Sequence, residues 1–331
     1  MSDPILVEIT RGGVVESFHH GALAVLDADG KVVLSLGDID RPIFPRSAVK
    51  GFQALPLIET GAAEKFGLTD AEIAMACASH SGEARHAETA AGTLAKAGLD
   101  VTCLECGAHW PMGEKAARAL AASGTMPSAL HNNCSGKHSG FVCVAVQEGF
   151  DPKGYIQPAH PLMREITASL AAMTGYDLTK TAVGVDGCSI PTFAIPLRNI
   201  AHGFAKFGSG QGLGPARAKA AARLRKAVAA EPFFVAGSER FDTVVMEALR
   251  ERAFIKTGAE GVYCAALPEV GLGIALKIED GAGRAAETVM AALLARFLKL
   301  SEAEAAIVVP RTDFSMKNWN GIEVGRMRAA L

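Results

Sequence analysis

Two residues near position 50 have the types and the spacing that nucleophilic catalysis requires. Ser47 and Lys50 lie in the run FPRSAVK, which begins at Phe44. The pattern predicts a helix over residues 47 to about 60, ended by Gly61, and positions three apart on a helix share a face. A serine hydroxyl needs a neighbouring base to become a nucleophile, and a lysine serves as that base when burial lowers its pKa toward neutrality.

Taken alone, this stretch is a weak signal, because an N-cap at Ser47 and a solvated surface position for Lys50 are the more ordinary interpretation. Two further pieces change that balance. The loop sequence SHSG begins at Ser79, directly after an apolar run, and the sequence KTG begins at Lys256 on a predicted strand. A serine–lysine helix, a hydroxyl-rich loop and a late lysine–threonine–glycine strand follow one another in the same order in serine β-lactamases and penicillin-binding proteins.

Two other stretches concentrate polar residues in an otherwise alanine-rich chain. They are HNNCSGKHSG from His131 and VDGCSIP from Val185. Such groups cost stability unless they are paired or used. Cys134 and Cys188 lie among glycines and serines, so we expect both to line a tight loop site. Two thiolates and a third donor suit zinc or another soft metal, although two ordinary buried cysteines also fit the pattern.

Composition narrows the classes of function. The chain has 331 residues, 49% hydrophobic and 21% charged, which allows one large or two moderate domains. A net charge of −2 gives no basic bias toward nucleic acid or an anionic membrane, and 6% aromatic residues make a base-stacking platform improbable. The chain shows no signal-peptide pattern and no apolar stretch of about eighteen residues, so we expect a cytoplasmic protein without a membrane span. Seven cysteines in such a reducing compartment do not predict a disulfide framework.

The pattern of elements predicts a mixed α/β (α+β) fold. Strands are expected at both ends of the chain, over residues 5–10, 14–17, 22–26, 31–36, 254–258, 261–266, 272–278 and about 320–328. Helices are expected mainly in between, over 84–98, 113–123, 138–149, 160–174, 215–231 and 239–252, with another at 285–298. We therefore expect a single domain over 1–331. Its antiparallel sheet would come from about 1–45 and 253–331, with a mostly helical portion, about 46–252, beside it.

Four motifs together give a specific resemblance. They are RSAVKGFQ from Arg46, CASHSGE from Cys77, HNNCSGKH from His131 and GVDGC from Gly184. This set resembles the Rhizobium etli-type L-asparaginases, the asparaginase II family, over essentially the whole chain. The resemblance implies a β-lactamase-like fold, hydrolysis of L-asparagine to L-aspartate and ammonia, and a homodimer.

The resemblance also implies particular site residues. It implies two serine–lysine pairs, Ser47 with Lys50 and Ser79 with Lys256. It further implies a zinc site that aids substrate binding rather than acting as the hydrolytic Lewis acid, with the ligands Cys134, Lys137 and Cys188. A lysine ligand must lose its proton to bind a metal ion.

Roles for the remaining polar residues follow as hypotheses. Ser47 would be the nucleophile, with Ser79 and Lys256 relaying protons, since the serine of the serine–lysine helix plays that part in the related folds. The substrate-binding candidates are Arg46 for the carboxylate, Asp186 for the α-ammonium group, and His80 and His138 as groups that orient neighbours. A surface ion pair for Arg46 and a turn for Asp186 are equally good interpretations, and a lone histidine is more often structural.

Other classes of function remain as alternatives. A glutaminase or a β-lactamase-like serine hydrolase would use the same serine–lysine chemistry. A non-catalytic amino-acid-binding module would keep Arg46 and Asp186 without needing Ser47. A redox protein would use the CLEC sequence from Cys103 to Cys106, but the neighbouring residues do not show the strand–helix setting that this motif requires.

Overall fold

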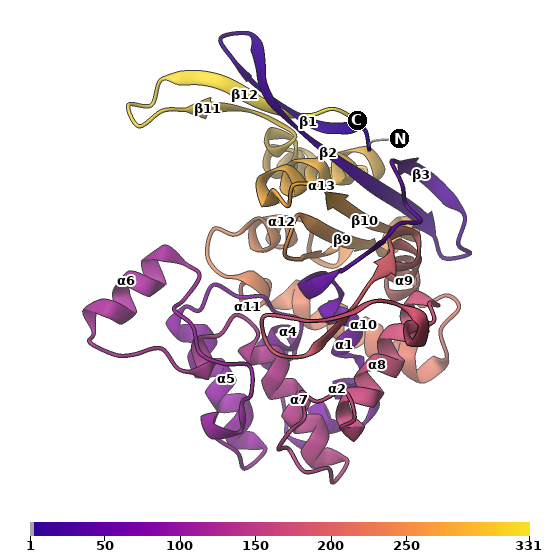
Figure 1. Cartoon of the computed structure of the whole chain (residues 1–331), viewed down its shortest axis with the longest axis vertical. Helices are drawn as coiled ribbons and strands as arrows, with labels where there is room; N and C mark the ends of the chain where they lie inside the picture. The colour runs from indigo at the N-terminus through magenta and orange to yellow at the C-terminus, as the bar shows by residue number, and fades with distance from the viewer. Residues whose placement is uncertain (1–2) are drawn as a thin grey trace.

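One antiparallel sheet combines both ends of the chain in the computed structural model, which describes residues 3–331 (Figure 1). The strand order is β11-β12-β1-β2-β10-β9-β8, and β3 also pairs with β2. These strands are β1 (Ile5–Arg11), β2 (Val14–Asp27), β3 (Val32–Leu36), β8 (Phe254–Thr257), β9 (Val262–Leu267), β10 (Leu272–Ile278), β11 (Asp313–Lys317) and β12 (Glu323–Ala329). The expectation that the two ends share one sheet is confirmed.

Strand β2 is the longest strand of the sheet and joins its two parts. Its first half pairs with β1, from Val14 opposite Arg11 to His20 opposite Ile5. Its second half pairs with β10, from Gly21 opposite Ile278 onward. The sequence pattern predicted two separate strands here. The chain instead runs straight through and changes its partner, because the apolar second half is buried against β10 while the first half extends outward beside β1.

Two helices cover much of this sheet. Helix α13 (Gly283–Phe297) packs on β9, β10, β1 and β12, and α9 (Leu197–Ser209) packs on β2, β10 and β9. The sequence analysis missed α9, although its buried residues recur at helical spacing in Leu197, Ile200, Ala201 and Phe204. Its glycines and its closeness to the glycine-rich run from 208 onward concealed that period.

Most of the remaining helices form the lower body in Figure 1. The expected segments in this portion are confirmed as α5 (Ala84–Lys96), α6 (Glu114–Ala122), α7 (Ser135–Gln147), α8 (Pro161–Thr174), α10 (Pro215–Ala230) and α12 (Phe241–Leu249). Helices α3 (Ala62–Lys65), α4 (Asp70–Ala76), α11 (Phe233–Ala236) and α14 (Glu302–Val308) were not expected. Helix α12 lies beside the sheet, and α14 packs on α12 and α13. Helix α4 begins at a capping box between Thr69 and Glu72, a signal that the sequence does carry. No helix within residues 3–331 is long and apolar enough to cross a membrane.

The helix predicted over residues 47 to about 60 is broken into three short pieces. A 3₁₀ turn, η1 (Arg46–Val49), leads into α1 (Lys50–Gln53) and, after Ala54, into α2 (Leu55–Glu59). Pro56 lies in the first turn of α2, where a residue without an N–H group is tolerated. Pro56 cannot donate the hydrogen bond that would continue the preceding helix, so the helix breaks before it. The predicted stop is confirmed, since Gly61 follows with a φ of 77° in the left-handed region.

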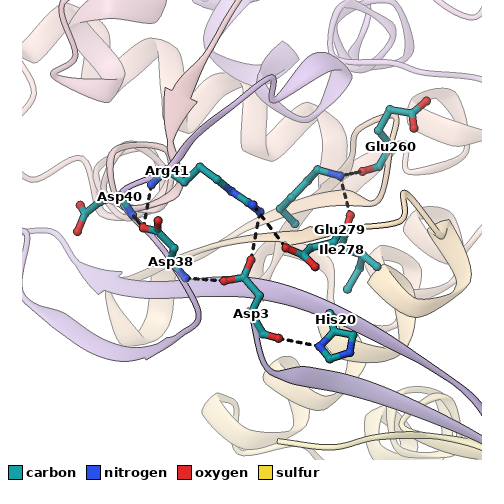
Figure 2. A network of polar contacts seen from close by, with 9 residues as sticks. Asp3, His20, Asp38, Asp40, Arg41, Glu260, Ile278 and Glu279 are labelled. Carbon is teal, nitrogen blue, oxygen red and sulfur yellow. Dashed lines mark hydrogen bonds and ion pairs between the residues drawn. The ribbon is translucent and has the colours of Figure 1, made fainter. Parts of the chain in front are cut away.

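A polar network ties the segment before η1 to the sheet (Figure 2). The buried carboxylate of Asp3 accepts from the backbone N–H of Asp38 at 2.8 Å and from the Arg41 guanidinium at 3.1 Å. Arg41 also donates to Glu279, just beyond β10, at 3.4 Å. The loop that delivers the chain to η1 is therefore fastened both to the N-terminal segment and to the end of a central strand.

The same network holds the turn after β8. The Lys277 ammonium donates to the backbone carbonyls of Glu260 and Ile278, each at 2.6 Å (Figure 2). Glu260 lies in the β8–β9 turn and adopts a positive φ of 59°. Two loops that are far apart in the sequence, one leading to Ser47 and one following Lys256, are thus held at the same end of β10.

Replacement of Gly273 should destabilise the contact between α9 and the sheet. A Cβ at this position of β10 would lie 2.0 Å from the carbonyl oxygen of Ala201 and 2.1 Å from the nitrogen of Ala205, both backbone atoms of α9. We expect Gly273→Ala to lower the free energy of unfolding by at least about 1–3 kcal/mol. The matched control is Gly283→Ala, whose Cβ would meet nothing within 4 Å. Urea denaturation of both variants measures the effect, and equal midpoints would contradict this packing.

Candidate active site

Ser47 and Lys50 are brought to one face by the 3₁₀ turn. The backbone N–H of Lys50 donates to the carbonyl of Ser47, which is the i to i+3 bond of a 3₁₀ helix. In that helix, side chains three apart eclipse each other more closely than they do in an α-helix. The Ser47 side chain lies at the edge of the interior, whereas Lys50 is 1% exposed. A surface role for this lysine is therefore excluded.

The buried Lys50 ammonium is held by two other segments. Its Nζ donates to the carbonyl of Ala78 at 2.5 Å and to the sulfur of Cys134 at 3.0 Å. It therefore lies where the serine–lysine, SHSG and CSGK motifs meet. Within residues 3–331 no hydrogen bond joins Ser47 Oγ to Lys50 Nζ, so their proximity rests on the backbone turn.

The SHSG segment is extended and held along both edges. Ser79 and Ser81 donate their backbone N–H groups to Val235 and Ala236 of α11, at 2.9 and 2.8 Å, and His80 donates to Asn133 at 3.1 Å. The side-chain amide of Asn133 donates to Ser79 Oγ at 2.9 Å. The sequence analysis did not single out Asn133, although it belongs to the HNNC motif.

Lys256 comes from β8 and is fully buried. The end of β8 lies against η1, since a Cβ on Gly258 would come within 2.6 Å of the Pro45 carbonyl and 3.2 Å of Ala48 Cβ. Burial lowers the pKa of Lys256 to about 7, against the opposing charge of Asp242. Lys256 Nζ donates to the Thr257 carbonyl at 2.9 Å. In the described part of the chain no hydrogen bond links it to Ser79, and that pairing stays a prediction.

The three predicted metal ligands lie together. Cys134 and Lys137 flank the first turn of α7, and Cys188 lies on the loop between β5 (Val183–Val185) and β6 (Pro191–Phe193). Lys137 Nζ donates to the sulfur of Cys188 at 3.0 Å. A hydrogen bond from Cys188 holds the pKa of the Cys134 thiol well below its ordinary value, against the effect of burial. The same hydrogen bond, together with burial, raises the pKa of Cys188, so Cys134 is the more acidic of the two thiols.

This donor set fits a zinc ion on chemical grounds. Among residues 3–331 no group of three or more histidine, cysteine, aspartate or glutamate side chains is placed to hold a metal. A metal here would therefore be held by two sulfurs and the Lys137 amine, which leaves room for a fourth ligand. Burial disfavours the charge on Lys137, but the neighbouring sulfurs outweigh it and raise its pKa, so zinc would have to displace a proton from this amine.

Arg46 and Asp186 pair with each other beside these groups. The guanidinium Nε and Nη2 of Arg46 lie 3.0 and 2.8 Å from Asp186 Oδ1. Burial would raise the pKa of Asp186, but the hydrogen bond from Arg46 holds it below its ordinary value. Arg46 has a φ of 52°, a left-handed conformation that costs a non-glycine residue about 1–3 kcal/mol. The backbone at Arg46 is thus bent to aim this side chain at the loop that carries Asp186 and Cys188.

The two histidines are packed into the interior. His80 and His138 have no exposed surface. His80 Nδ1 accepts from the backbone N–H of Gly82 at 3.1 Å, so Nε2 carries the proton and donates to Ser135 Oγ at 2.9 Å. His138 Nδ1 lies 2.5 Å from the Tyr155 hydroxyl. Burial lowers the pKa of both rings, which keeps them neutral. These contacts favour holding neighbours in place, and a direct role in substrate binding stays a prediction.

Two openings flank the cluster. A cleft of about 840 Å³ is lined by residues 81–84, by one side of α6 and by residues 238–240. A second, of about 480 Å³, is lined by Arg46 together with Arg41, Lys277, Glu260 and Glu279. Their walls include Ser81 and Arg46, close neighbours in the sequence of the two candidate serines. The candidate residues Ser47, Lys50, Ser79 and Lys256 are not among those that line the 840 Å³ cleft.

One family model matches nearly the whole chain. The family model for L-asparaginase II matches residues 7–329. The chain belongs to the asparaginase II family. Its members are asparaginase-type hydrolases, which fits the nucleophile and base candidates gathered here. Among curated proteins, none matches this chain.

Solved structures similar to this chain include a β-lactamase from Mycobacterium bovis, 15% identical with a TM-score of 0.44, covering 84% of this chain and 94% of that one. A β-lactamase described as putative, from Bacteroides dorei DSM 17855, is 13% identical with a TM-score of 0.41, covering 78% and 84%. A variant of simvastatin synthase from Aspergillus terreus is 12% identical with a TM-score of 0.39, covering 82% and 88%. The fold assignment rests on the sheet order and the family match rather than on these scores.

Proposed function

We propose that this protein is an L-asparaginase that hydrolyses L-asparagine to L-aspartate and ammonia through a serine–lysine mechanism. The proposal is supported by membership of the asparaginase II family and by the contacts of η1 and α1 with two other segments. Lys50 Nζ donates to the carbonyl of Ala78, next to Ser79, and the residue after β8, Gly258, lies against Pro45 and Ala48. We further propose that the enzyme is a cytoplasmic homodimer built from single-domain chains, as the sequence analysis expects.

In this mechanism Ser47 Oγ attacks the side-chain amide carbon of asparagine, and Lys50 takes its proton. A neutral amine has two N–H groups and one lone pair. The two contacts of Lys50, to Ala78 O and Cys134 Sγ, use both N–H groups and leave the lone pair for Ser47. Ser47 precedes the first 3₁₀ bond of η1, which the Ala48 N–H donates to the Pro45 carbonyl, and the backbone N–H of Ser47 itself would stabilise the oxyanion. The C–N bond then breaks, the leaving nitrogen receives a proton, and ammonia departs.

Ser79 and Lys256 complete the proton path. With a pKa of about 7, Lys256 is partly neutral at physiological pH and accepts or returns a proton without a large energetic cost. Water then attacks the acyl-enzyme, and aspartate is released. Arg46 would bind the substrate carboxylate and Asp186 the α-ammonium group, so that substrate would replace the contact that these two side chains make with each other.

Replacing the nucleophile should abolish turnover without unfolding the protein. We expect Ser47→Ala to reduce ammonia release from L-asparagine by about 10⁴-fold or more, since the covalent step is lost. Ser35→Ala, on an exposed position of β3, is the control and should be unchanged. A coupled ammonia assay measures both, with L-glutamine as the second substrate. Near-normal activity in Ser47→Ala with loss in Ser79→Ala would reverse the two roles.

The pH dependence should report Lys256. Lys256 must be neutral to accept a proton in the proposed path, so kcat/KM should rise with pH through an apparent pKa of about 7. The Asp242 carboxylate raises this pKa, and Asp242→Asn should therefore move the rising limb to lower pH. Asp313→Asn, on the exposed face of β11, should leave the profile in place. If the rising part of the kcat/KM profile stays at the same pH in Asp242→Asn, Lys256 does not belong to the proton path.

Zinc, when bound, would supply a positive charge that anchors the substrate. We expect about one zinc ion per chain by elemental mass spectrometry after dialysis against zinc, and a loss of most of it in Cys188→Ala. Cys143→Ala, at a buried cysteine of α7 outside this cluster, should keep its zinc. Chelation should raise KM for asparagine while the maximal rate is preserved. A fall in the maximal rate at unchanged KM would place the metal in the chemical step.

A further inference from the structure

The hydroxyl of Ser79, one of the two candidate catalytic serines, is held by a second side chain. Asn133 Nδ2 donates to Ser79 Oγ at 2.9 Å. The Asn133 carbonyl also accepts from the backbone N–H of His80 at 3.1 Å, so both ends of Asn133 hold the SHSG segment. A hydroxyl that accepts one hydrogen bond still has its own proton to donate. Asn133 therefore leaves the Ser79 proton free to point away from the amide.

His109 fixes Asn133 from the other side. Its Nδ1 lies 2.6 Å from the carbonyl oxygen of Trp110, which only accepts, so Nδ1 carries the proton. Nε2 is then an acceptor and receives the backbone N–H of Asn133 at 3.0 Å. Asn133 Oδ1 lies 3.3 Å from the same nitrogen, but an unprotonated Nε2 cannot donate to it. The backbone contact is thus the bond that holds Asn133 to the ring.

The loop that carries His109 is itself anchored near the site. The amide of Asn132 donates to the carbonyls of Cys106 and Gly107, at 2.8 and 3.1 Å. At the far end of the loop, Gly113 donates its backbone N–H to the Ser81 carbonyl at 2.9 Å. Helix α6, which follows, has no buried residue and projects from the body (Figure 1). His109 therefore lies at the base of this projecting helix and joins it to the site.

We propose that Asn133 is a positioning residue for Ser79 and that His109 acts through Asn133. The Asn133 amide donor occupies one lone pair of Ser79 Oγ and directs the hydroxyl proton toward Lys256, its proposed partner in the proton path. This inference rests on the proposed function, because Ser79 is assigned to the proton path there. The structure assigns to His109 and Asn133 a part that no motif in the sequence indicated.

The test compares Asn133→Asp with a matched variant. A carboxylate only accepts, so in Asn133→Asp the Ser79 hydroxyl would donate to it and turn its proton away from the base. We expect kcat for asparagine to fall about 10²-fold, with KM changed less than about threefold. Asn199→Asp is the control, because Asn199 likewise uses its amide as a donor, to the Thr174 carbonyl at 3.1 Å. Circular dichroism and thermal melting of both variants check the fold.

His109 is tested by a conservative pair. Glutamine keeps an acceptor for the Asn133 N–H, whereas leucine does not. We expect His109→Gln to retain most of kcat and His109→Leu to lose about tenfold or more, with similar melting temperatures. A purely structural role would lower stability in both variants without separating kcat from KM.

A second readout separates this inference from the proposed function. A fluorophosphonate probe labels an activated serine regardless of the natural substrate, and peptide mass spectrometry locates the label. Slower labelling in Asn133→Asp than in Asn199→Asp, in a protein that does not release ammonia from asparagine, would support the inference and overturn the proposed substrate. Labelling and turnover of Asn133→Asp within twofold of the unmodified protein would overturn the inference. If the unmodified protein is neither labelled nor active, both fall.

Discussion

The structure depends on the burial of three lysines in one small volume. Lys50, Lys137 and Lys256 each have at most 1% of their surface exposed, and an isolated ammonium in such surroundings is strongly disfavoured. Each solves the problem differently. Lys137 keeps its charge beside two sulfurs, Lys256 gives up part of its charge, and Lys50 is held between a carbonyl and a sulfur. The sulfurs of Cys134 and Cys188 accept hydrogen bonds from Lys50 and Lys137, respectively.

Pairing the buried lysines with carbonyl and sulfur acceptors requires that segments far apart in the sequence lie next to each other. Lys50 comes from the start of α1, Cys134 from the start of α7, Cys188 from a hairpin loop and Lys256 from β8. No local motif supports such a cluster, so the scaffold must position each segment separately. The contacts of Asp3, Arg41 and Lys277 serve that purpose at one end of β10. Catalytic potential and structural strain therefore occur in the same place, with Arg46 in a left-handed conformation at its edge.

Sequence patterns predicted the sheet from both chain ends because strands at the two ends alternate with clear turns. They singled out Ser47, Lys50 and the cysteine pair as candidates because those residues lie in dense polar motifs. They missed α9, whose helical period is interrupted by glycines. They also missed Asn133 and His109, since an asparagine or a histidine has no spacing rule that links it to a serine fifty residues away. Only the folded backbone brings these side chains together.

The pairing of β1 with β12 has a consequence for how the molecule comes into being. Val7 lies opposite Ala329, so the outer part of the sheet joins residues from the first and last parts of the chain. Closing so long a loop is entropically costly and slow, so we expect this pairing to form late in folding. Strand β8, with Lys256, also follows most of the helical portion. A nascent chain therefore holds Ser47 long before it holds Lys256, so the proposed site cannot be complete until β8 has been made.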